Sequence, residues 1–429
     1  MTTSNLSKRA QAILAFDDNR ILPPSGGVLS AEEFDSSTNT DGLINMSISE
    51  NRLVFDLLRE KLQKCMIPPE TWEDDMFMYS ELGGVPELKE AIANYLRVTT
   101  RAVMPVDPNK MAVLNGADSG LEAFGQIICD PGESILVPVP LYYGIHRCLK
   151  VRFDVNIVPI PLTCEPNSGE SKPFELTVER AEQAYKKAIQ EGIVVKGLFL
   201  VNPNNPLGDV YSRQQVLDLL KFANRYDLHV VLDEVYMNCI FEDGVDHYSI
   251  FQFKEDEIPD LQKVHFLWTF SKDLAMGGMR ISVNYTWNED VLRSLYAISH
   301  FHSVPTGWQK IMAKLLSDTD WFTDVFLPTS VKRLKEVFDY FTAGLKKLGV
   351  TCYGGPAGLY VWADFSKFLS SPTAEAEIEF HHKLMKAGVQ FSPSLLCLGP
   401  ERGWFRVVFA RKRDIIDVAL ERIQRALQS

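Results

Sequence analysis

Cysteine is scarce in this chain, and the cysteines that are present lie far apart. The 429 residues include seven cysteines and eight histidines, and no two cysteines form a C-x-x-C pair. An odd number of scattered thiols does not suit a disulfide framework, and no histidine joins them at ligand-like spacing. We therefore expect reduced thiols of a cytoplasmic protein and no metal site. The pair His381–His382 is interpreted as a solvated helix face.

Long apolar runs and clustered positive charge are also missing. No uninterrupted apolar stretch reaches the ~18 residues that a membrane-spanning helix needs. The N-terminus lacks the apolar core of a secretion signal. The formal net charge is -12, and no block of lysine and arginine offsets it. The composition therefore argues against membrane insertion and against nonspecific binding to nucleic acid.

The middle of the chain alternates apolar runs with amphipathic segments. Apolar residues recur at helical spacing in residues 86–96 and 212–226. Nearly continuous apolar runs predict parallel strands that are covered on both faces, at residues 133–139, 195–201, 228–235 and 264–270. This alternation predicts an open α/β sheet, in which ligands bind at the carboxyl ends of the strands.

The C-terminal third has a different pattern. A long helical segment precedes short strand-like pieces, and an amphipathic helix ends the chain. Three parts are therefore expected: an N-terminal arm with part of a small domain, a large domain, and a C-terminal small domain. Their predicted bounds are residues 1–69, 70–305 and 306–429. About the first 30 residues are expected to form an extended arm that is loosest at Pro23–Gly27.

Polar clusters stand where the predicted strands end. NPNNPLG begins at Asn202, DEVY begins at Asp233, and SK begins at Ser271, each after an apolar run. NGADS, from Asn115 to Ser119, leads into a helical segment. One end of the sheet would thus hold a lysine, an aspartate, an asparagine, a tyrosine and a helix start. This set suits a phosphorylated aldehyde cofactor.

In order and spacing, these motifs resemble those of the fold type I pyridoxal-phosphate enzymes, the aspartate aminotransferase superfamily. ISENRLVFDLL, from Ile48, and VVKGLFLVNPNNPLG, from Val194, are similar to segments of its 1-aminocyclopropane-1-carboxylate (ACC) synthase branch. The resemblance covers nearly the whole chain. It implies pyridoxal 5'-phosphate (PLP) as the cofactor, a large domain with a mostly parallel, seven-stranded type of sheet between helices, and a smaller α+β domain.

The resemblance implies that Lys272 and Asp233 are the central catalytic residues. Lys272 is expected to bond covalently to the cofactor aldehyde and later to move protons, which requires a lowered pKa. Asp233 would pair with the pyridine nitrogen, so that the ring can act as an electron sink. The alternatives are a surface lysine at a strand end and an aspartate that caps the next helix.

Further residues are expected around the cofactor ring. Asn205 and Tyr236 would hydrogen-bond its hydroxyl oxygen, and Tyr142 would stack on its face. Tyr143 is the alternative to Tyr142, because the two tyrosines are adjacent. Asn202 is expected only to stabilise its own turn.

Phosphate is expected at a helix N-terminus. Arg280 would return on a glycine-rich loop to bind phosphate oxygens, and Thr269 or Ser271 would add a hydroxyl. Backbone N–H groups would complete the cradle, from Ala117, Asp118 and Ser119. Asp118 departs from the family, which often has a neutral residue here. Two like charges ~4 Å apart would cost about 4 kcal/mol at an effective dielectric of ~20, so we expect its side chain to point away.

The substrate is expected to meet Arg406, Glu50 and Asn205. Arg406 would bind the α-carboxylate bidentately, and an edge-strand arginine is the alternative. Glu50 matches a glutamate that ACC synthases place near the substrate, and a helix-capping glutamate is the alternative. Tyr79 resembles a tyrosine that reaches the phosphate across a dimer interface. The resemblance therefore implies a homodimer with shared active sites.

The resemblance supports the cofactor more strongly than it supports one reaction. Glu50 and the ACC synthase-like segments favour a carbon–sulfur lyase, which eliminates sulfur from an amino acid or a cysteine conjugate, as fungal lyases of secondary metabolism do. However, Leu82 and Gly83 stand where plant ACC synthases have tyrosine and histidine. An aminotransferase of the aromatic or kynurenine type is the alternative. A non-catalytic ligand-binding module is a more remote one.

Overall fold

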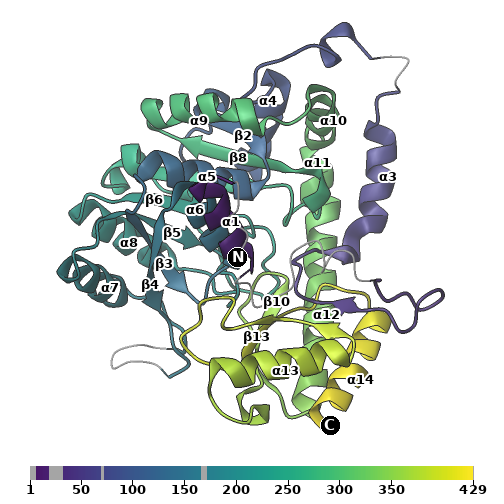
Figure 1. The fold of residues 1–429 in the computed structure, drawn as a ribbon. Coiled ribbons are helices and arrows are strands. Elements are labelled where there is room, and N and C mark those ends of the chain that lie inside the picture. Colours follow the sequence, from purple (N-terminus) through teal and green to yellow (C-terminus); the bar gives the residue numbers. More distant parts are fainter. Residues whose placement is uncertain (1–5, 19–31, 69–71, 166–171, 429) are drawn as a thin grey trace.

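A seven-stranded sheet lies at the centre of the computed structural model, which describes residues 6–18, 32–68, 72–165 and 172–428 (Figure 1). Its strand order is β2-β8-β7-β6-β5-β3-β4, and only β8 runs antiparallel to its neighbours. The predicted, mostly parallel α/β sheet is confirmed. The strands are Met111–Asn115 (β2), Ser134–Val139 (β3), Asn156–Pro161 (β4), Val195–Val201 (β5), His229–Asp233 (β6), Val264–Thr269 (β7) and Ile281–Thr286 (β8).

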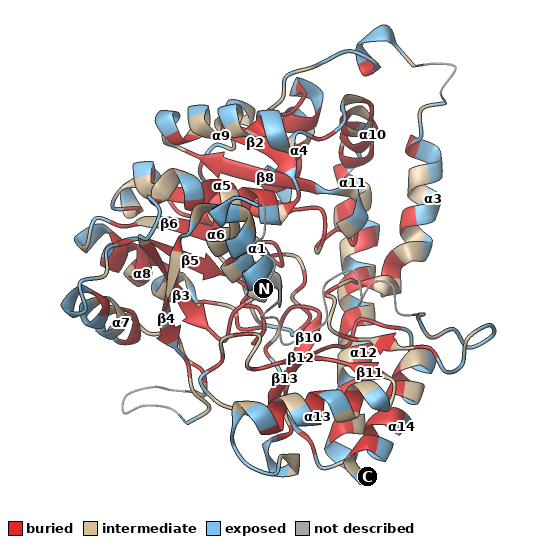
Figure 2. Cartoon of the chain, viewed as in Figure 1, coloured by how far each residue is buried: buried red, intermediate tan, exposed pale blue. Residues whose placement is uncertain are grey.

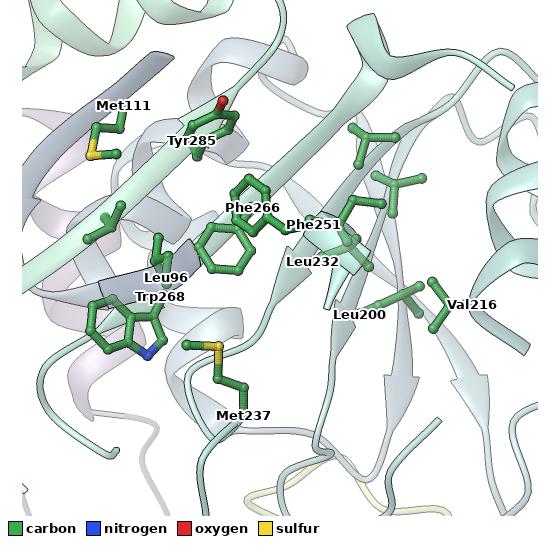
Figure 3. Packing of buried hydrophobic residues seen from close by; sticks show 14 of the residues in the cluster. Leu96, Met111, Leu200, Val216, Leu232, Met237, Phe251, Phe266, Trp268 and Tyr285 are labelled. Carbon is green, nitrogen blue, oxygen red and sulfur yellow. The ribbon is translucent and has the colours of Figure 1, made fainter. Parts of the chain in front are cut away.

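Helices cover both faces of this sheet, as the continuous apolar runs predict. Successive side chains of a strand point to opposite faces, so Phe266 and Trp268 of β7 join one buried cluster and Leu267 joins the other. Figure 3 shows the first cluster, in which Leu96 of α4 and Val216 of α8 lie near the sheet. The covering helices are Pro86–Thr99 (α4), Ala117–Ile128 (α5), Tyr143–Phe153 (α6), Val178–Gln190 (α7), Arg213–Arg225 (α8), Glu289–His302 (α9) and Thr306–Leu316 (α10).

A second, smaller group of elements packs around an antiparallel sheet of four strands in the order β12-β13-β10-β9. The N-terminal segment joins it, because β1 (Ile44–Asn45) pairs with β11 (Val389–Gln390). The remaining elements are Phe55–Cys65 (α3), Thr319–Trp321 (α11), Leu327–Lys347 (α12), Thr351–Tyr353 (β9), Tyr360–Asp364 (β10), Ala374–Lys386 (α13), Ser392–Pro393 (β12), Trp404–Val408 (β13) and Arg413–Gln428 (α14). Figure 2 shows that their buried faces turn inward.

The long helix α12 leads from the large sheet to the smaller one (Figure 1). Helix α10 lies before it and packs against α4 and α3, although α10 follows the predicted boundary at residues 305/306. The domain bounds therefore stay a prediction. No helix in the described ranges is both long and apolar enough to cross a membrane.

Two expectations about local structure are wrong. Residues Lys8–Asp18 form a helix, α1, instead of an extended arm, and Phe16 makes an edge contact with His146 of α6. Pro23–Gly27 lies outside the described residues. His381 is buried in α13 instead of solvated, with 1% of its surface exposed. Burial lowers the pKa of His381 to about 4, so this ring is neutral near pH 7.

Candidate active site

The strand register brings the polar motifs together at one edge of the large sheet. Asp233, the last residue of β6, lies opposite Val201 of β5 and Leu267 of β7. The chain segments that follow these strands therefore meet around one cavity of about 180 Å³. Its wall contains Glu50, Ala117, Asp118, Tyr142, Asn205, Asp233, Tyr236, Thr269, Ser271, Lys272 and Arg280.

Lys272 lies in the turn after β7 and is partly buried. Its Nζ donates a hydrogen bond to the Ser49 carbonyl at 2.8 Å. Burial, together with the positive charge of Arg406, lowers the pKa of Lys272 to about 8. The next residue, Asp273, fixes the turn by accepting a hydrogen bond from Trp268 Nε1 at 2.8 Å. A positioned amine with a lowered pKa is a competent nucleophile and base.

Asp233 is 5% exposed, and no α-helix follows it within the turn that leads to Tyr236. It is therefore not a helix cap. Its carboxylate accepts a hydrogen bond from the Val235 N–H at 3.3 Å. Burial, with a smaller contribution from the charge of Asp118, raises the pKa of Asp233 to about 7. A protonated ring nitrogen facing this carboxylate would stabilise its ionised form, so the position suits a pyridine nitrogen.

Arg406 connects the smaller sheet to this edge. It lies on β13 between β12 and β10, so it is not an edge-strand residue. Its Nη1 donates to Asn205 Oδ1 at 3.0 Å, and its Nη2 donates to the Ser47 carbonyl at 2.6 Å and to Ser392 Oγ at 3.2 Å. Its buried Nε has no hydrogen-bond partner among the described residues. A carboxylate would satisfy this donor.

Asn205 also joins this network to Tyr236, because its Nδ2 donates to the Tyr236 hydroxyl at 3.4 Å. Asn202 serves its own turn instead, since its Oδ1 accepts from the Tyr211 N–H at 2.9 Å. Tyr142 lies in the cavity wall, whereas Tyr143 begins α6 and makes an edge contact with His146. The geometry therefore favours Tyr142 over Tyr143 as the residue beside the cofactor.

The start of α5 and Arg280 form a cradle that suits phosphate. Gly116 precedes α5 with φ 83°, and a Cβ atom there would lie 2.2 Å from Arg280 Nη2. The guanidinium therefore packs directly on Gly116, beside the first N–H groups of the helix. The hydroxyls of Thr269 and Ser271 lie 3.0 Å apart in the same wall. Helix N–H groups with a nearby arginine are a common phosphate site.

Gly116→Ala is expected to weaken PLP binding at least about tenfold, because the methyl group displaces Arg280 and the positive φ strains any side chain. The cofactor dissociation constant, measured by absorbance titration, checks this. Gly278→Ala is the matched control, because a Cβ at Gly278 meets nothing within 4 Å. Equal affinity of Gly116→Ala and wild type would contradict the cradle.

The predicted residues Ser119 and Tyr79 lie outside the cavity wall, whereas Glu50 lines the wall but pairs with another side chain. The backbone N–H of Ser119, which was expected in the phosphate cradle, donates to the Gly116 carbonyl at 3.1 Å, and its Oγ donates to the Asn115 carbonyl at 2.9 Å. Tyr79 is fully exposed, outside the cavity wall. The carboxylate of Glu50 pairs with Arg52 at 3.0 Å. Glu50 does not cap the following turn, because Asn51 is its N-cap.

Asp118 does not follow the expectation of a side chain outside the site. The residue lines the cavity, and its Oδ1 accepts a hydrogen bond from the Tyr142 hydroxyl at 3.3 Å. The sequence analysis also missed contributors. The Ser49 carbonyl and the Ser392 hydroxyl contact Lys272 and Arg406 across the fold, and no local signal marks either serine. Asp273 was missed as well, although its position directly after Lys272 could have suggested a role in the site.

Comparison with known proteins agrees with this geometry. The model of the family described as aminotransferase class I and II matches residues 42–423. A human protein named probable inactive ACC synthase-like protein 2 is 36% identical, over 92% of this chain and 69% of its own length. ACC synthase 11 of Arabidopsis thaliana is 34% identical, over 91% of this chain and 85% of its length.

Among solved structures, the aspartate aminotransferase of Thermus thermophilus with maleate superimposes with a TM-score of 0.74 at 22% identity. The match covers 99% of this chain and 100% of that chain. At this identity, the superposition supports the fold and not the reaction.

Proposed function

Because this chain belongs to the class I and II aminotransferase family and has that family's PLP dependence, we propose that it cleaves a carbon–sulfur bond of an amino acid. The observation that carries this proposal is the position of Glu50. Glu50 lies in the same cavity wall as Lys272, directly after the serine whose carbonyl accepts from Lys272 Nζ. The similarity to an ACC synthase of Arabidopsis thaliana supports the same reading.

Some of the site residues would bind the cofactor and the substrate, and Lys272 would take part in the reaction itself. Bound PLP supplies an electron sink for the negative charge that develops at the substrate Cα. Asp233 would hold its ring nitrogen, and Arg280 with the start of α5 would hold its phosphate. Arg406 binds the α-carboxylate and so orients the Cα–H bond towards Lys272. Lys272 Nζ takes the Cα proton as a general base.

Elimination then breaks the bond from Cβ or Cγ to sulfur. In β-elimination the sulfur leaves with the bonding electron pair and takes up a proton as a thiol. The remaining three-carbon unit is hydrolysed to pyruvate and ammonia. Thiol, pyruvate and ammonia must therefore appear in equal amounts, and no keto acid is consumed.

A second candidate is transamination, which the family match itself favours. Lys272, Asp233 and Arg406 serve both reactions, because both begin with loss of the Cα proton. The human relative named probable inactive raises a third reading, a non-catalytic binding protein. The three residues are all in place here, and the lowered pKa of Lys272, about 8, supports catalysis.

One assay distinguishes a carbon–sulfur lyase, an aminotransferase and a non-catalytic binding protein. Purified protein with PLP is incubated with a cysteine S-conjugate and no keto acid, and thiol, pyruvate and ammonia are measured. Equal release over many turnovers establishes the lyase. Release of a sulfur-containing keto acid that requires a second keto acid establishes the aminotransferase. PLP binding without either product supports the binding protein.

Tyr79 is proposed to complete the active site of a second subunit. If so, dimers formed from Lys272→Ala and Tyr79→Ala protomers contain one intact site. A random mixture should then recover up to about a quarter of the wild-type activity, because half of the dimers are mixed and each has one intact site. Rates are measured after the two proteins are mixed, unfolded and refolded together. Activity no higher than that of either parent would exclude the shared site.

A further inference from the structure

Asp118 places a negative charge beside the position that the cofactor phosphate would occupy. It is the second residue of α5, whose first turn forms the cradle with Arg280. Asp118 lines the same cavity as Arg280 and Lys272. Its Oδ1 accepts from the Tyr142 hydroxyl at 3.3 Å, which ties the carboxylate to this wall. In the described part of the chain, no cation forms an ion pair with it.

The cradle offers little positive charge against this carboxylate. Arg280 donates from Nη1 to the Gly277 carbonyl at 3.2 Å, and within the described ranges no carboxylate pairs with it. It contributes one positive charge, and the start of α5 adds about half a charge. A fully ionised phosphate carries about two negative charges, and Asp118 adds a third. Asp118 and Arg280 are both exposed in the structure. Negative charge would nevertheless exceed positive charge in the cradle, so the phosphate and the Asp118 carboxylate would repel each other.

The other ionisable groups around Asp118 do not remove this excess. Lys272 is a further cation in the cavity wall, and its Nζ already donates to the Ser49 carbonyl. Asp233 and Glu50 add acid groups to the cavity wall. The groups that face Asp118 or its helix from neighbouring elements are Tyr142 directly before α6, Cys148 and Arg152 of α6, Asp233 of β6, Lys272 and Arg280 after β7, Glu50 before α3, Glu122 of α5 itself and His302 of α9.

We propose that Asp118 makes the cofactor phosphate bind together with a proton, so that cofactor affinity falls as the pH rises. The proton comes from solvent and lies between a carboxyl oxygen of Asp118 and a phosphate oxygen. One O–H donor and one acceptor then replace two repelling anions. By linkage, affinity falls about tenfold per pH unit where the free phosphate and the free carboxyl are both ionised. This chain thus differs from relatives with a neutral residue at this position.

Proton uptake can be measured without turnover. Apoprotein is titrated calorimetrically at pH 8 with pyridoxamine 5'-phosphate, which has no aldehyde for Lys272 to attack. Buffers of different ionisation enthalpy give the number of protons taken up. Wild type should take up about one proton more than Asp118→Asn, and its affinity should fall about tenfold more per pH unit from pH 7 to 9. Asparagine keeps an acceptor for the Tyr142 hydroxyl.

Two controls isolate the phosphate and the position of the charge. Unphosphorylated pyridoxamine should bind wild type and Asp118→Asn with equal proton uptake. Glu122→Gln removes one charge from the same helix, where Glu122 pairs with Arg152 at 3.1 Å, and should leave uptake unchanged. Equal uptake by wild type and Asp118→Asn would overturn the proposal. If Asp118→Asn does not fold, a wild-type affinity that falls equally for both ligands with rising pH would overturn it.

Discussion

Lys272→Ala protein is expected to fold, to bind PLP weakly and to lose at least about a hundredfold in turnover. A positioned general base contributes about 10²–10⁴-fold to rate, and the covalent attachment to the cofactor is lost as well. The turn should survive, because Asp273 still accepts from Trp268 Nε1. Turnover, together with the visible spectrum before and after borohydride reduction, checks the prediction. Turnover near the wild-type level would remove Lys272 from the mechanism.

Lys263→Ala is the matched control for this variant. Lys263 precedes the opposite end of β7, where it forms an ion pair with Asp227 outside the cavity. It should keep wild-type activity. A similar loss in both variants would indicate general damage to the strand instead of a catalytic role for Lys272.

The lowered pKa of Lys272 also predicts a pH profile. Only the neutral amine attacks an aldehyde, and burial lowers the pKa of Lys272 to about 8. The rate of covalent PLP attachment should therefore rise about tenfold per pH unit below pH 8 and level off above it. Stopped-flow absorbance from pH 6 to 10 measures this rate. A rate that keeps rising to pH 10 would mean that Lys272 has the pKa of an ordinary lysine.

The central part of the site could be predicted because its signals are local. Each motif follows an apolar run directly, and parallel strands bring their carboxyl ends to one edge. Thus Asp233 ends β6 and Lys272 lies in the turn after the adjacent strand β7, just as each follows its own apolar run in the sequence.

Other parts depend on contacts between distant residues. Arg406 meets Asn205 across 201 positions, and Lys272 meets Ser49 across 223 positions. No sequence feature near Ser49 or Arg406 indicates these distant partners. The family resemblance supplied Arg406, and it supplied no role for Ser49.

The two wrong expectations about local structure have physical reasons. Lys8–Asp18 mixes polar and apolar residues without a continuous apolar face, so its helix has a weak sequence signal. The prediction that His381 is solvated relied on the polar character of the His381–His382 pair. Its helical spacing from buried Glu377 and Leu384 places it on the buried face of α13. Periodicity was the better guide there than residue type.

Arg406→Ala is expected to raise KM for α-amino acids on the order of a hundredfold. Removing one partner of a buried, charge-assisted contact costs about 3 kcal/mol, and Arg406 is only 7% exposed. Amines that lack the carboxylate should bind wild type and variant alike. Arg413→Ala, an exposed arginine at the start of α14, is the control and should leave KM unchanged.

Arg406 should also affect Lys272, and Arg406→Lys separates its two roles. The positive charge of Arg406 helps to lower the pKa of Lys272. Loss of that charge in Arg406→Ala should therefore raise the pH at which the rate of PLP attachment levels off. Arg406→Lys keeps the charge but not the paired donors that fit a carboxylate, so it should raise KM while the plateau stays near its wild-type pH. If both variants shift the plateau equally, the charge of Arg406 does not set the basicity of Lys272, and its effect is on local structure alone.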